Sequence, residues 1–187
     1  MYLKIMTDLN SVILLGDSIF CRLLSKYPGY FSELSSIFCI SGQFIHELKL
    51  KIKANRNLVR GKIVVVLIGT NDLKDRVDLN HINQSVKTLL RLLRNLGCRI
   101  YIVETLPIAR WGLTAESQTS IRKYCEFLYS CHTLGVKLIK VFDTFFVNGE
   151  VDLSLYCNYY PSGRVDRIHP NSEGLSLLLS VIVNTLT

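Results

Sequence analysis

Short apolar runs alternate with longer segments of helical period along almost the whole chain. Five runs are rich in β-branched or other apolar residues and have the length of strands: Val12–Leu15, Ile37–Ile40, Ile63–Ile68, Arg99–Val103 and Lys137–Phe142. Strand–helix alternation of this kind favours right-handed βαβ crossovers, which place parallel strands side by side and helices on both faces of the sheet. We therefore expect an α/β fold in three layers, α/β/α, around a five-stranded parallel sheet.

Apolar positions spaced by three and four residues predict the helices between these strands. The apolar helix faces run over residues 44–52, 82–96, 121–131 and 175–186. Gly97 and Gly135 are expected to end the second and third helices. Thr114 and Asn171 are expected to cap the third and the last. The Ile63–Ile68 run is apolar throughout, as expected of a central strand buried on both faces.

Length and hydropathy limit the class of protein. The 187 residues, 49% of them hydrophobic and 20% charged, suit one folded domain over residues 1–187. The longest strongly apolar stretch, Leu175–Leu186, is shorter than the roughly 20 residues that span a bilayer. The Val12–Leu15 run lacks a following small-residue cleavage site, so no signal peptide is expected. We expect an intracellular, cytoplasmic protein without a transmembrane segment.

Six cysteines occur without any CxxC pair. Most lie in apolar stretches, where a free thiol behaves as a small hydrophobic side chain. We expect reduced, buried thiols, and the alternatives are disulfides or a metal site. The six are Cys21, Cys39, Cys98, Cys125, Cys131 and Cys157.

The chain carries 22 basic and 15 acidic residues, a net charge of +7. Two clusters contribute much of the excess: Lys49, Lys51, Lys53, Arg56, Arg60 and Lys62, and then Lys87, Arg91 and Arg94. Such clusters can bind the phosphates of an anionic lipid or a nucleic acid. No aromatic residue interleaves the first cluster, so base stacking has no platform there. A solvated basic surface is the preferred interpretation.

The loops beyond the carboxyl ends of the strands are where function gathers in a parallel sheet. Gly16-Asp17-Ser18 follows the first strand and opens a helix. The positive end of the helix dipole and nearby backbone N–H groups favour negative charge on the Ser18 oxygen. Ser18 is therefore a candidate nucleophile, although Asp and Ser also cap helices for structural reasons alone.

Two further loops carry candidate donors to an oxyanion. Gly42 follows the second predicted strand, where a glycine lets the backbone approach a ligand and aim its N–H outward. Asn71 follows the third predicted strand and can offer its side-chain amide. The structural alternatives are an ordinary turn glycine and an Asx turn.

Asp166 and His169 stand three residues apart just before the last predicted helix. The carboxylate can hold one imidazole nitrogen, which fixes the tautomer and supports the imidazolium formed during catalysis. The positive end of the following helix opposes protonation, which suits a base that rests neutral. The alternative is a capped turn with His169 packed beside Pro170. Together the four loops supply a nucleophile, a base, an orienting acid and oxyanion donors, the requirements of acyl transfer.

These motifs resemble those of the SGNH (GDSL-type) hydrolases. Four blocks match in order: Gly16-Asp17-Ser18, Gly42, Gly69-Thr70-Asn71-Asp72 and Asp166-x-x-His169-Pro170. The resemblance implies a flavodoxin-like strand order, 2-1-3-4-5, and an exposed site with no metal or organic cofactor. It also implies Ser18 as nucleophile, His169 as general base and Asp166 as its orienting partner. Ser18, Gly42 and Asn71 then form the oxyanion hole.

Two positions depart from the usual family pattern. Cys39 stands where the family often has glycine, and Ile19 stands where it has leucine. Neither departure removes a catalytic group. The compact chain is similar to the acetylhydrolase branch typified by the platelet-activating-factor acetylhydrolase catalytic subunits.

Substrate specificity is expected in the loops after the fourth and fifth predicted strands. Arg110 and Trp111 would meet an anionic or apolar part of the substrate. Tyr159 and Tyr160 would wall an acyl pocket, or else these aromatic rings cover the edge of the core.

Two functions follow from these expectations. The first is a serine esterase acting on small acyl or acetyl esters of lipid, sugar or glycerol type. The second is a catalytically silent binding module for RNA or another anionic partner, since some domains of this family have lost catalysis and bind RNA. The complete set of Ser18, Asp166 and His169 favours the first function, and the basic clusters favour the second.

Overall fold

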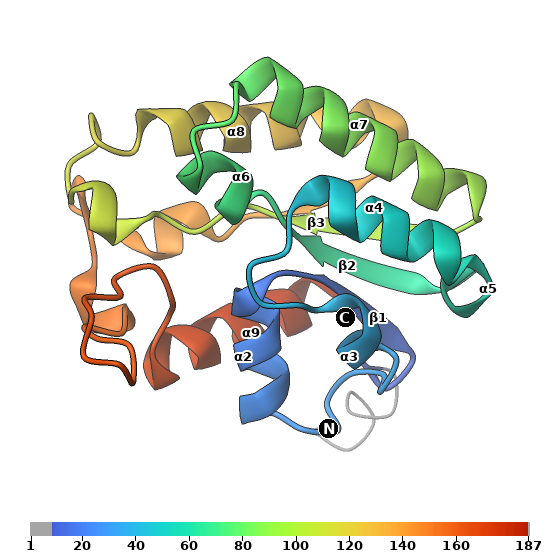
Figure 1. The fold of residues 1–187 in the computed structure, drawn as a ribbon, viewed down its shortest axis with the longest axis horizontal. Coiled ribbons are helices and arrows are strands. Elements are labelled where there is room, and N and C mark those ends of the chain that lie inside the picture. The colour runs from blue at the N-terminus through green and yellow to red at the C-terminus, as the bar shows by residue number, and fades with distance from the viewer. Residues whose placement is uncertain (1–8, 187) are drawn as a thin grey trace.

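Four parallel strands form the middle layer of the protein (Figure 1). The computed structural model describes residues 9–186, and within that range the sheet has the order β1-β2-β3-β4. Its strands are β1 (Val12–Gly16), β2 (Ile63–Leu67), β3 (Arg99–Val103) and β4 (Lys137–Ile139). β1 and β2 are in register from Val12 opposite Ile63 to Gly16 opposite Leu67, so these two strands end at the same edge. The predicted α/β fold with a parallel sheet is confirmed.

The expected strand over Ile37–Ile40 is wrong, and with it the five-stranded count. Residues Ser35–Phe38 form a short helix, α3. After it, the chain meets β1 through a single parallel bridge between Cys39 and Gly16, where the Ile40 N–H donates to the Gly16 carbonyl at 3.2 Å. The Ser35 hydroxyl accepts the Leu14 N–H at 3.0 Å, so a side chain occupies a hydrogen-bonding position on the outer edge of β1. The bridge lies beside β1, at the position that the 2-1-3-4-5 order assigns to the missing strand.

The fifth predicted strand is shorter than expected. It ends at Ile139 as β4, whereas the apolar run continues to Phe142. The N–H groups of Val141 and Phe142 both donate to Glu104 Oε2, at 2.9 and 3.0 Å, so the chain turns there instead of extending the ladder.

Six helices cover the two faces of the sheet (Figure 1). One face carries α2 (Ser18–Lys26), α3 and α9 (Ser172–Leu186), and the other carries α4 (Ile45–Ala54), α7 (Leu79–Asn95) and α8 (Thr119–Ser130). The N-cap of α9 is as predicted, since Asn171 Oδ1 accepts the N–H groups of Glu173 and Gly174. The predicted Thr114 cap of the third helix is wrong. α8 begins at Thr119, and Thr114 lies in a preceding turn.

The remaining elements are short and lie in the connections. They are α5 (Arg56–Val59), α6 (Thr70–Lys74), the antiparallel pair β5 (Phe146–Val147) and β6 (Glu150–Val151), and the 3₁₀ turns η1 (Ala109–Trp111), η2 (Cys131–Leu134), η3 (Phe142–Thr144) and η4 (Leu153–Leu155).

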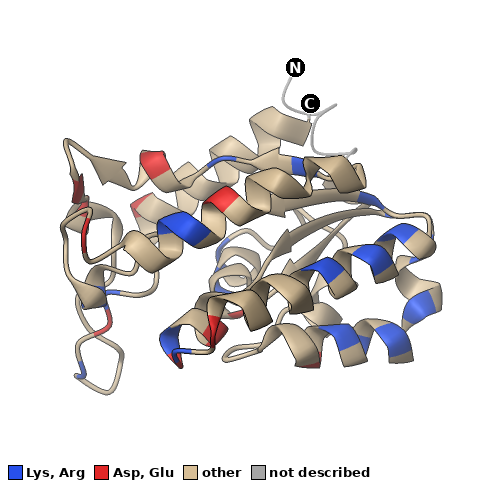
Figure 2. Cartoon of the chain, turned by 90° about the horizontal axis from the view of Figure 1, so that it is seen from above, with Lys and Arg blue, Asp and Glu red and all other residues tan. Residues whose placement is uncertain are grey.

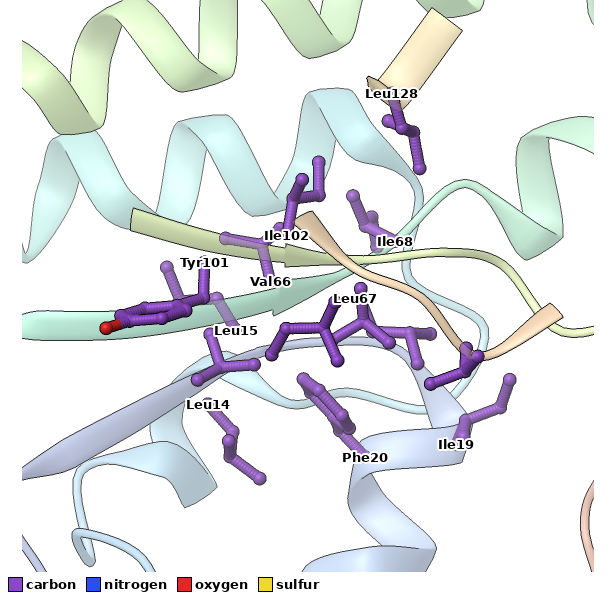
Figure 3. Packing of buried hydrophobic residues seen from close by; sticks show 14 of the residues in the cluster. Leu14, Leu15, Ile19, Phe20, Val66, Leu67, Ile68, Tyr101, Ile102 and Leu128 are labelled. Carbon is purple, nitrogen blue, oxygen red and sulfur yellow. The ribbon is translucent and has the colours of Figure 1, made fainter. Parts of the chain in front are cut away.

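The core lies on both faces of the sheet, and Figure 3 shows part of it. Ile19 and Phe20 of α2 approach one face, and Leu128 of α8 approaches the other. All five residues of β1 are buried, which confirms that both faces of this sheet are covered. Burial of each such side chain stabilises the fold by about 1.5–3 kcal/mol.

The cysteines are free thiols, as predicted. Three of the six are buried and three are half-buried. Among the described residues, no helix combines the length and the apolar character that crossing a membrane requires.

Candidate active site

The four loops that carry the candidate residues lie at the carboxyl edge of the sheet. Ser18 is the first residue of α2, directly after β1, and Asn71 lies in α6, directly after β2. Gly42 precedes α4, and the turn from Asp166 to His169 precedes α9. The carboxyl ends of β1 and β2 and the starts of α2 and α6 lie near one another in Figure 1.

Ser18 is held by the tight turn between β1 and α2. A Cβ at Gly16 would lie 2.4 Å from the Leu67 carbonyl oxygen, so only glycine fits where β1 and β2 meet. Asp17 Oδ1 then accepts the Ile19 N–H at 3.0 Å and caps the helix. The local sequence therefore places the Ser18 hydroxyl at the positive end of α2.

His169 joins Ser18 to Asp166. Its Nε2 lies 2.8 Å from Ser18 Oγ, and its Nδ1 lies 2.8 and 3.0 Å from the two carboxylate oxygens of Asp166. An ionised carboxylate can only accept, so Nδ1 carries the proton and donates it to Asp166. Nε2 is then unprotonated and accepts the Ser18 O–H, which is the arrangement that activates a serine.

Asp166 is fully buried, and a compact turn holds it in place. Its Oδ1 also accepts the backbone N–H groups of Ile168 and His169, at 3.1 and 3.2 Å. Cys157 pairs with the same turn, donating its N–H to the His169 carbonyl and accepting the Arg167 N–H, both at 2.9 Å. Arg167 has a φ of 49°, a left-handed conformation that brings Asp166 and His169 onto the same side of the turn.

The environment of His169 keeps the imidazole neutral. Burial lowers the pKa of His169 below its usual 6.5, although the hydrogen bond and charge of Asp166 act in the opposite direction. The positive charges of Arg22 and Lys74 lower the pKa of His169 further. A base of this kind is ready to accept a proton at neutral pH.

The candidate oxyanion donors lie in two different loops. Gly42 has a φ of 79°, which favours glycine, and its backbone N–H has no acceptor among residues 9–186. Asn71 Nδ2 donates to the Gln43 carbonyl at 3.1 Å, and its Oδ1 accepts from Lys74 Nζ at 3.1 Å. These contacts fix the amide plane and leave the second N–H of Nδ2 available to a ligand.

The three tyrosines in the segment before the turn from Asp166 to His169 differ in their surroundings. The Tyr160 ring stands edge-on to the His169 ring, with centroids 5.6 Å apart. Tyr159 is 65% exposed, and its backbone pairs with Val165. Tyr156 belongs to the core, where its hydroxyl donates to the Pro107 carbonyl at 2.7 Å.

Arg110 and Trp111 belong to η1, which is attached to the turn. The Arg110 N–H donates to the Arg167 carbonyl at 3.0 Å. Trp111 lines a groove of about 620 Å³ together with Leu73 and Val77. Leu73 lies two residues after Asn71 in α6, and side chains so spaced point to different faces of a helix, so the groove lies beside the candidate oxyanion hole without including Asn71.

The structure adds two residues to those found from the sequence. Arg22 NH2 lies 3.3 Å from Asp166 Oδ2. The buried Gln43 side chain donates to the Gly16 and Phe38 carbonyls, at 2.7 and 2.9 Å, and so ties the loop of Gly42 to the loop of Ser18. The available signal for Arg22 was its position four residues after Ser18 in a predicted helix, which places both on one face.

One family model matches most of the chain. The model of the GDSL-like lipase and acylhydrolase family matches residues 14–177. No curated protein matches the sequence.

Solved structures share the fold at low sequence identity. A GDSL-like lipase from Bacteroides thetaiotaomicron matches with a TM-score of 0.74 and 15% identity, over 97% of this chain and 91% of that chain. The OSK domain of Drosophila Oskar matches with a TM-score of 0.77 and 18% identity, over 98% and 95%. An acetyl xylan esterase matches with a TM-score of 0.66 and 16% identity, over 94% of this chain and 99% of that chain.

Proposed function

The chain belongs to the GDSL-like lipase and acylhydrolase family, and from this premise we propose that it is a serine esterase. Ser18 is the nucleophile, His169 the general base and Asp166 the residue that orients His169. The observation that carries the proposal is the unbroken chain of contacts from Ser18 Oγ through the imidazole to the Asp166 carboxylate, with 2.8 Å on each side of the ring.

The reaction follows from the hydrogen-bond directions. As Ser18 Oγ attacks the ester carbonyl carbon, His169 Nε2 takes the hydroxyl proton and the carbonyl oxygen becomes an oxyanion. The N–H groups of Ser18 and Gly42 and the Asn71 amide donate to that oxyanion. His169 then gives the proton to the leaving alcohol, and a water molecule repeats the cycle on the acyl-enzyme and releases the acid.

The proposed substrates are small acyl or acetyl esters of lipid, sugar or glycerol type. Tyr160 beside the imidazole and the exposed Tyr159 would contact the acyl side, since both belong to the loop that precedes the turn. Trp111 offers an apolar wall in the groove, and Arg110 offers a cation on the same 3₁₀ turn. The acetyl xylan esterase among the similar structures supports acetyl esters as the first substrates to test.

The test is hydrolysis of p-nitrophenyl acetate together with labelling by a fluorophosphonate probe. We expect Ser18→Ala and His169→Ala to abolish turnover, and Ser18→Ala to abolish labelling, because each removes a group that takes part in bond formation. Both variants should keep the thermal unfolding midpoint close to that of the wild-type protein. Retained activity in pure Ser18→Ala protein would refute the assignment.

A second candidate function is binding of RNA. The observation that favours it is the basic surface formed by α4, α5 and α7, together with the residues that follow α5 (Figure 2). None of its nine cations pairs with a carboxylate within residues 9–186. The nine are Lys49, Lys51, Lys53, Arg56, Arg60, Lys62, Lys87, Arg91 and Arg94.

The two functions are separable in one pair of measurements. A fluorophosphonate probe reports on Ser18, and a salt-dependent RNA-binding assay reports on the basic surface. If the protein is not labelled by the probe and binds RNA tightly, the result would favour the second function over the first.

A further inference from the structure

We propose that Arg22 is a positioning residue of the esterase site, which holds the Asp166 carboxylate from the same helix that presents Ser18. This inference rests on the proposed function of that site. It concerns a residue outside the four family motifs, and it assigns to α2 a second role beside carrying the nucleophile.

The two oxygens of Asp166 differ in how they are held. Oδ1 accepts two backbone N–H groups of its own turn and lies 2.8 Å from His169 Nδ1. Oδ2 lies 3.0 Å from His169 Nδ1 and 3.3 Å from Arg22 NH2, and the Tyr160 side chain also interacts with the Asp166 carboxylate. Arg22 therefore provides the outer anchor that fixes the rotation of the carboxylate, and with it the direction in which the imidazole is held.

Helix α2 contacts both ends of the His169–Asp166 pair. Ser18 and Arg22 are four residues apart, so they lie on the same face of α2, one turn from each other. Ser18 meets His169 Nε2, and Arg22 meets Asp166 Oδ2. A displacement of α2 relative to the turn would disturb both contacts together, so the Arg22 contact keeps the nucleophile aligned with its base.

A second contact ties Arg22 to the same turn. Its NH1 lies 3.6 Å from Cys157 Sγ. Cys157 in turn forms two backbone hydrogen bonds with the turn, through the His169 carbonyl and the Arg167 N–H. The guanidinium thus spans the carboxylate and the segment that supports it, a geometry for which its planar fork is better suited than an ammonium group.

The charge of Arg22 acts on His169 as well. The groups that face the imidazole are Asp166 in its own turn, Arg22 on α2, Lys74 on α6 and Tyr160 in the preceding loop. Asp166 favours the imidazolium, whereas Arg22 and Lys74 disfavour it and lower the pKa of His169. Removal of Arg22 should therefore raise the pKa of His169, in addition to loosening Asp166.

The test compares Arg22→Gln, Arg22→Lys and the control Lys26→Gln. Lys26 lies one turn further along α2, and it contacts Ser172 and Ser176 instead of the site. For each protein, the pKa of His169 is measured by NMR titration, and kcat and KM for p-nitrophenyl acetate are measured as functions of pH. The thermal unfolding midpoint shows whether each variant is folded.

We expect Arg22→Gln to raise the pKa of His169 and to move the acidic limb of the kcat profile to higher pH. The kcat should fall about ten- to hundredfold, the range expected of a misaligned catalytic group, with a smaller change in KM. Arg22→Lys keeps the charge, so it should restore the pKa of His169 and part of kcat. Lys26→Gln should change neither quantity.

Three results would overturn the proposal, and they are distinguishable. If wild-type protein is active and both Arg22 variants keep the wild-type pKa of His169 and the wild-type kcat, Arg22 has no positioning role. If only the unfolding midpoint falls, Arg22 is a packing residue. If wild-type protein hydrolyses no ester and ignores the fluorophosphonate probe, the proposed function fails, and the role of Arg22 fails with it.

Discussion

Asp17 is a buried carboxylate directly before the candidate nucleophile. Its Oδ1 caps α2, but its Oδ2 is buried without a hydrogen-bond partner among the described residues, as is Thr70 Oγ1. Burial raises the pKa of Asp17 from 3.8 to about 6, and the neighbouring Asp72 carboxylate adds to the increase. The folded protein therefore holds this proton more tightly than the unfolded chain does.

We expect Asp17→Asn to raise the free energy of unfolding at pH 8. In wild-type protein the cost of ionising Asp17 is absent below pH 3.8 and grows as the pH rises towards the folded pKa of about 6. Above that pH the cost stays constant, at up to about 3 kcal/mol. Asparagine still caps α2, does not ionise, and can donate to Thr70 Oγ1. Urea denaturation at pH 8 and pH 5 measures the difference.

Asp78→Asn is the matched control for this prediction. Asp78 caps α7 from an exposed position, where asparagine caps equally well. We expect the gain from Asp17→Asn to be clearly larger at pH 8 than at pH 5, and Asp78→Asn to show little change at either. An equal gain at both pH values would show that ionisation of Asp17 is not its source.

Some residues of the candidate site could be predicted from sequence motifs, and others could be found only in the tertiary structure. Ser18, Asp166 and His169 were predicted from short motifs, and the structure brings them into contact. Their catalytic roles stay predictions until the variants are assayed. Arg22 was missed because its partner Asp166 lies 144 residues away: its spacing from Ser18 indicates a shared helix face but does not indicate the contact with Asp166.

At the scale of elements, α6 is the short helix that positions Asn71. It begins after Gly69, and Asn71 is buried in its first turn. The Gln43 carbonyl and Lys74 hold the Asn71 amide. The helix thus fixes the Asn71 amide before any substrate arrives, which is what an oxyanion donor needs in order to act without reorganisation.

We expect Asn71→Ala to lower kcat for p-nitrophenyl acetate by about 10²–10³, with a smaller effect on KM, because one oxyanion donor is lost. It should also cost about 1–3 kcal/mol of stability, since the Gln43 carbonyl loses its donor. Steady-state kinetics and urea denaturation measure the two effects.

Asn55→Ala is the matched control for Asn71→Ala, because it removes a similar hydrogen bond away from the candidate site. Asn55 also donates its amide to a backbone carbonyl, that of Lys51, at the end of α4. This variant should lose stability while keeping the wild-type kcat. If Asn71→Ala lowers stability but keeps kcat, Asn71 does not belong to the oxyanion hole.

Helices were predicted more reliably than edge strands. The long apolar period over α7 gave a helix with the right location, because 17 residues repeat the same face several times. The run over Ile37–Ile40 is too short to show any period, so a helix and a strand fit it equally well. In the structure the Ser35 hydroxyl, instead of a strand, hydrogen-bonds to the edge of β1. Such a tertiary contact cannot be predicted from the composition of the segment.

At the scale of the whole molecule, chain topology creates the site. Ser18 and His169 are 151 residues apart, yet β1 and the segment before α9 bring them to one edge of the sheet. The strand–helix alternation predicted this edge, because parallel strands joined by crossovers all end on the same side. The alternation could not predict the distances between Ser18, His169 and Asp166, because they depend on how α2 and α9 pack.

The basic surface is also a property of the whole molecule, because it combines α4 and α7 from separate parts of the chain. If it binds RNA, the affinity should fall steeply with salt, since each phosphate contact on a single strand contributes about 0.7 to the slope of log K against log salt. We expect Arg91→Gln combined with Arg94→Gln to weaken binding of a single-stranded RNA and to reduce that slope by about 1.4. Fluorescence anisotropy over a salt series measures both.

A matched double variant decides whether position matters or only net charge. Lys123 and Arg164 are exposed and lie outside the basic surface, so Lys123→Gln combined with Arg164→Gln removes the same charge elsewhere. The slope should then stay close to that of wild-type protein, because counterions are released only where phosphates are contacted. Equal slopes for the two double variants would show that the protein attracts RNA through its net charge of +7 and that α4 and α7 form no binding surface.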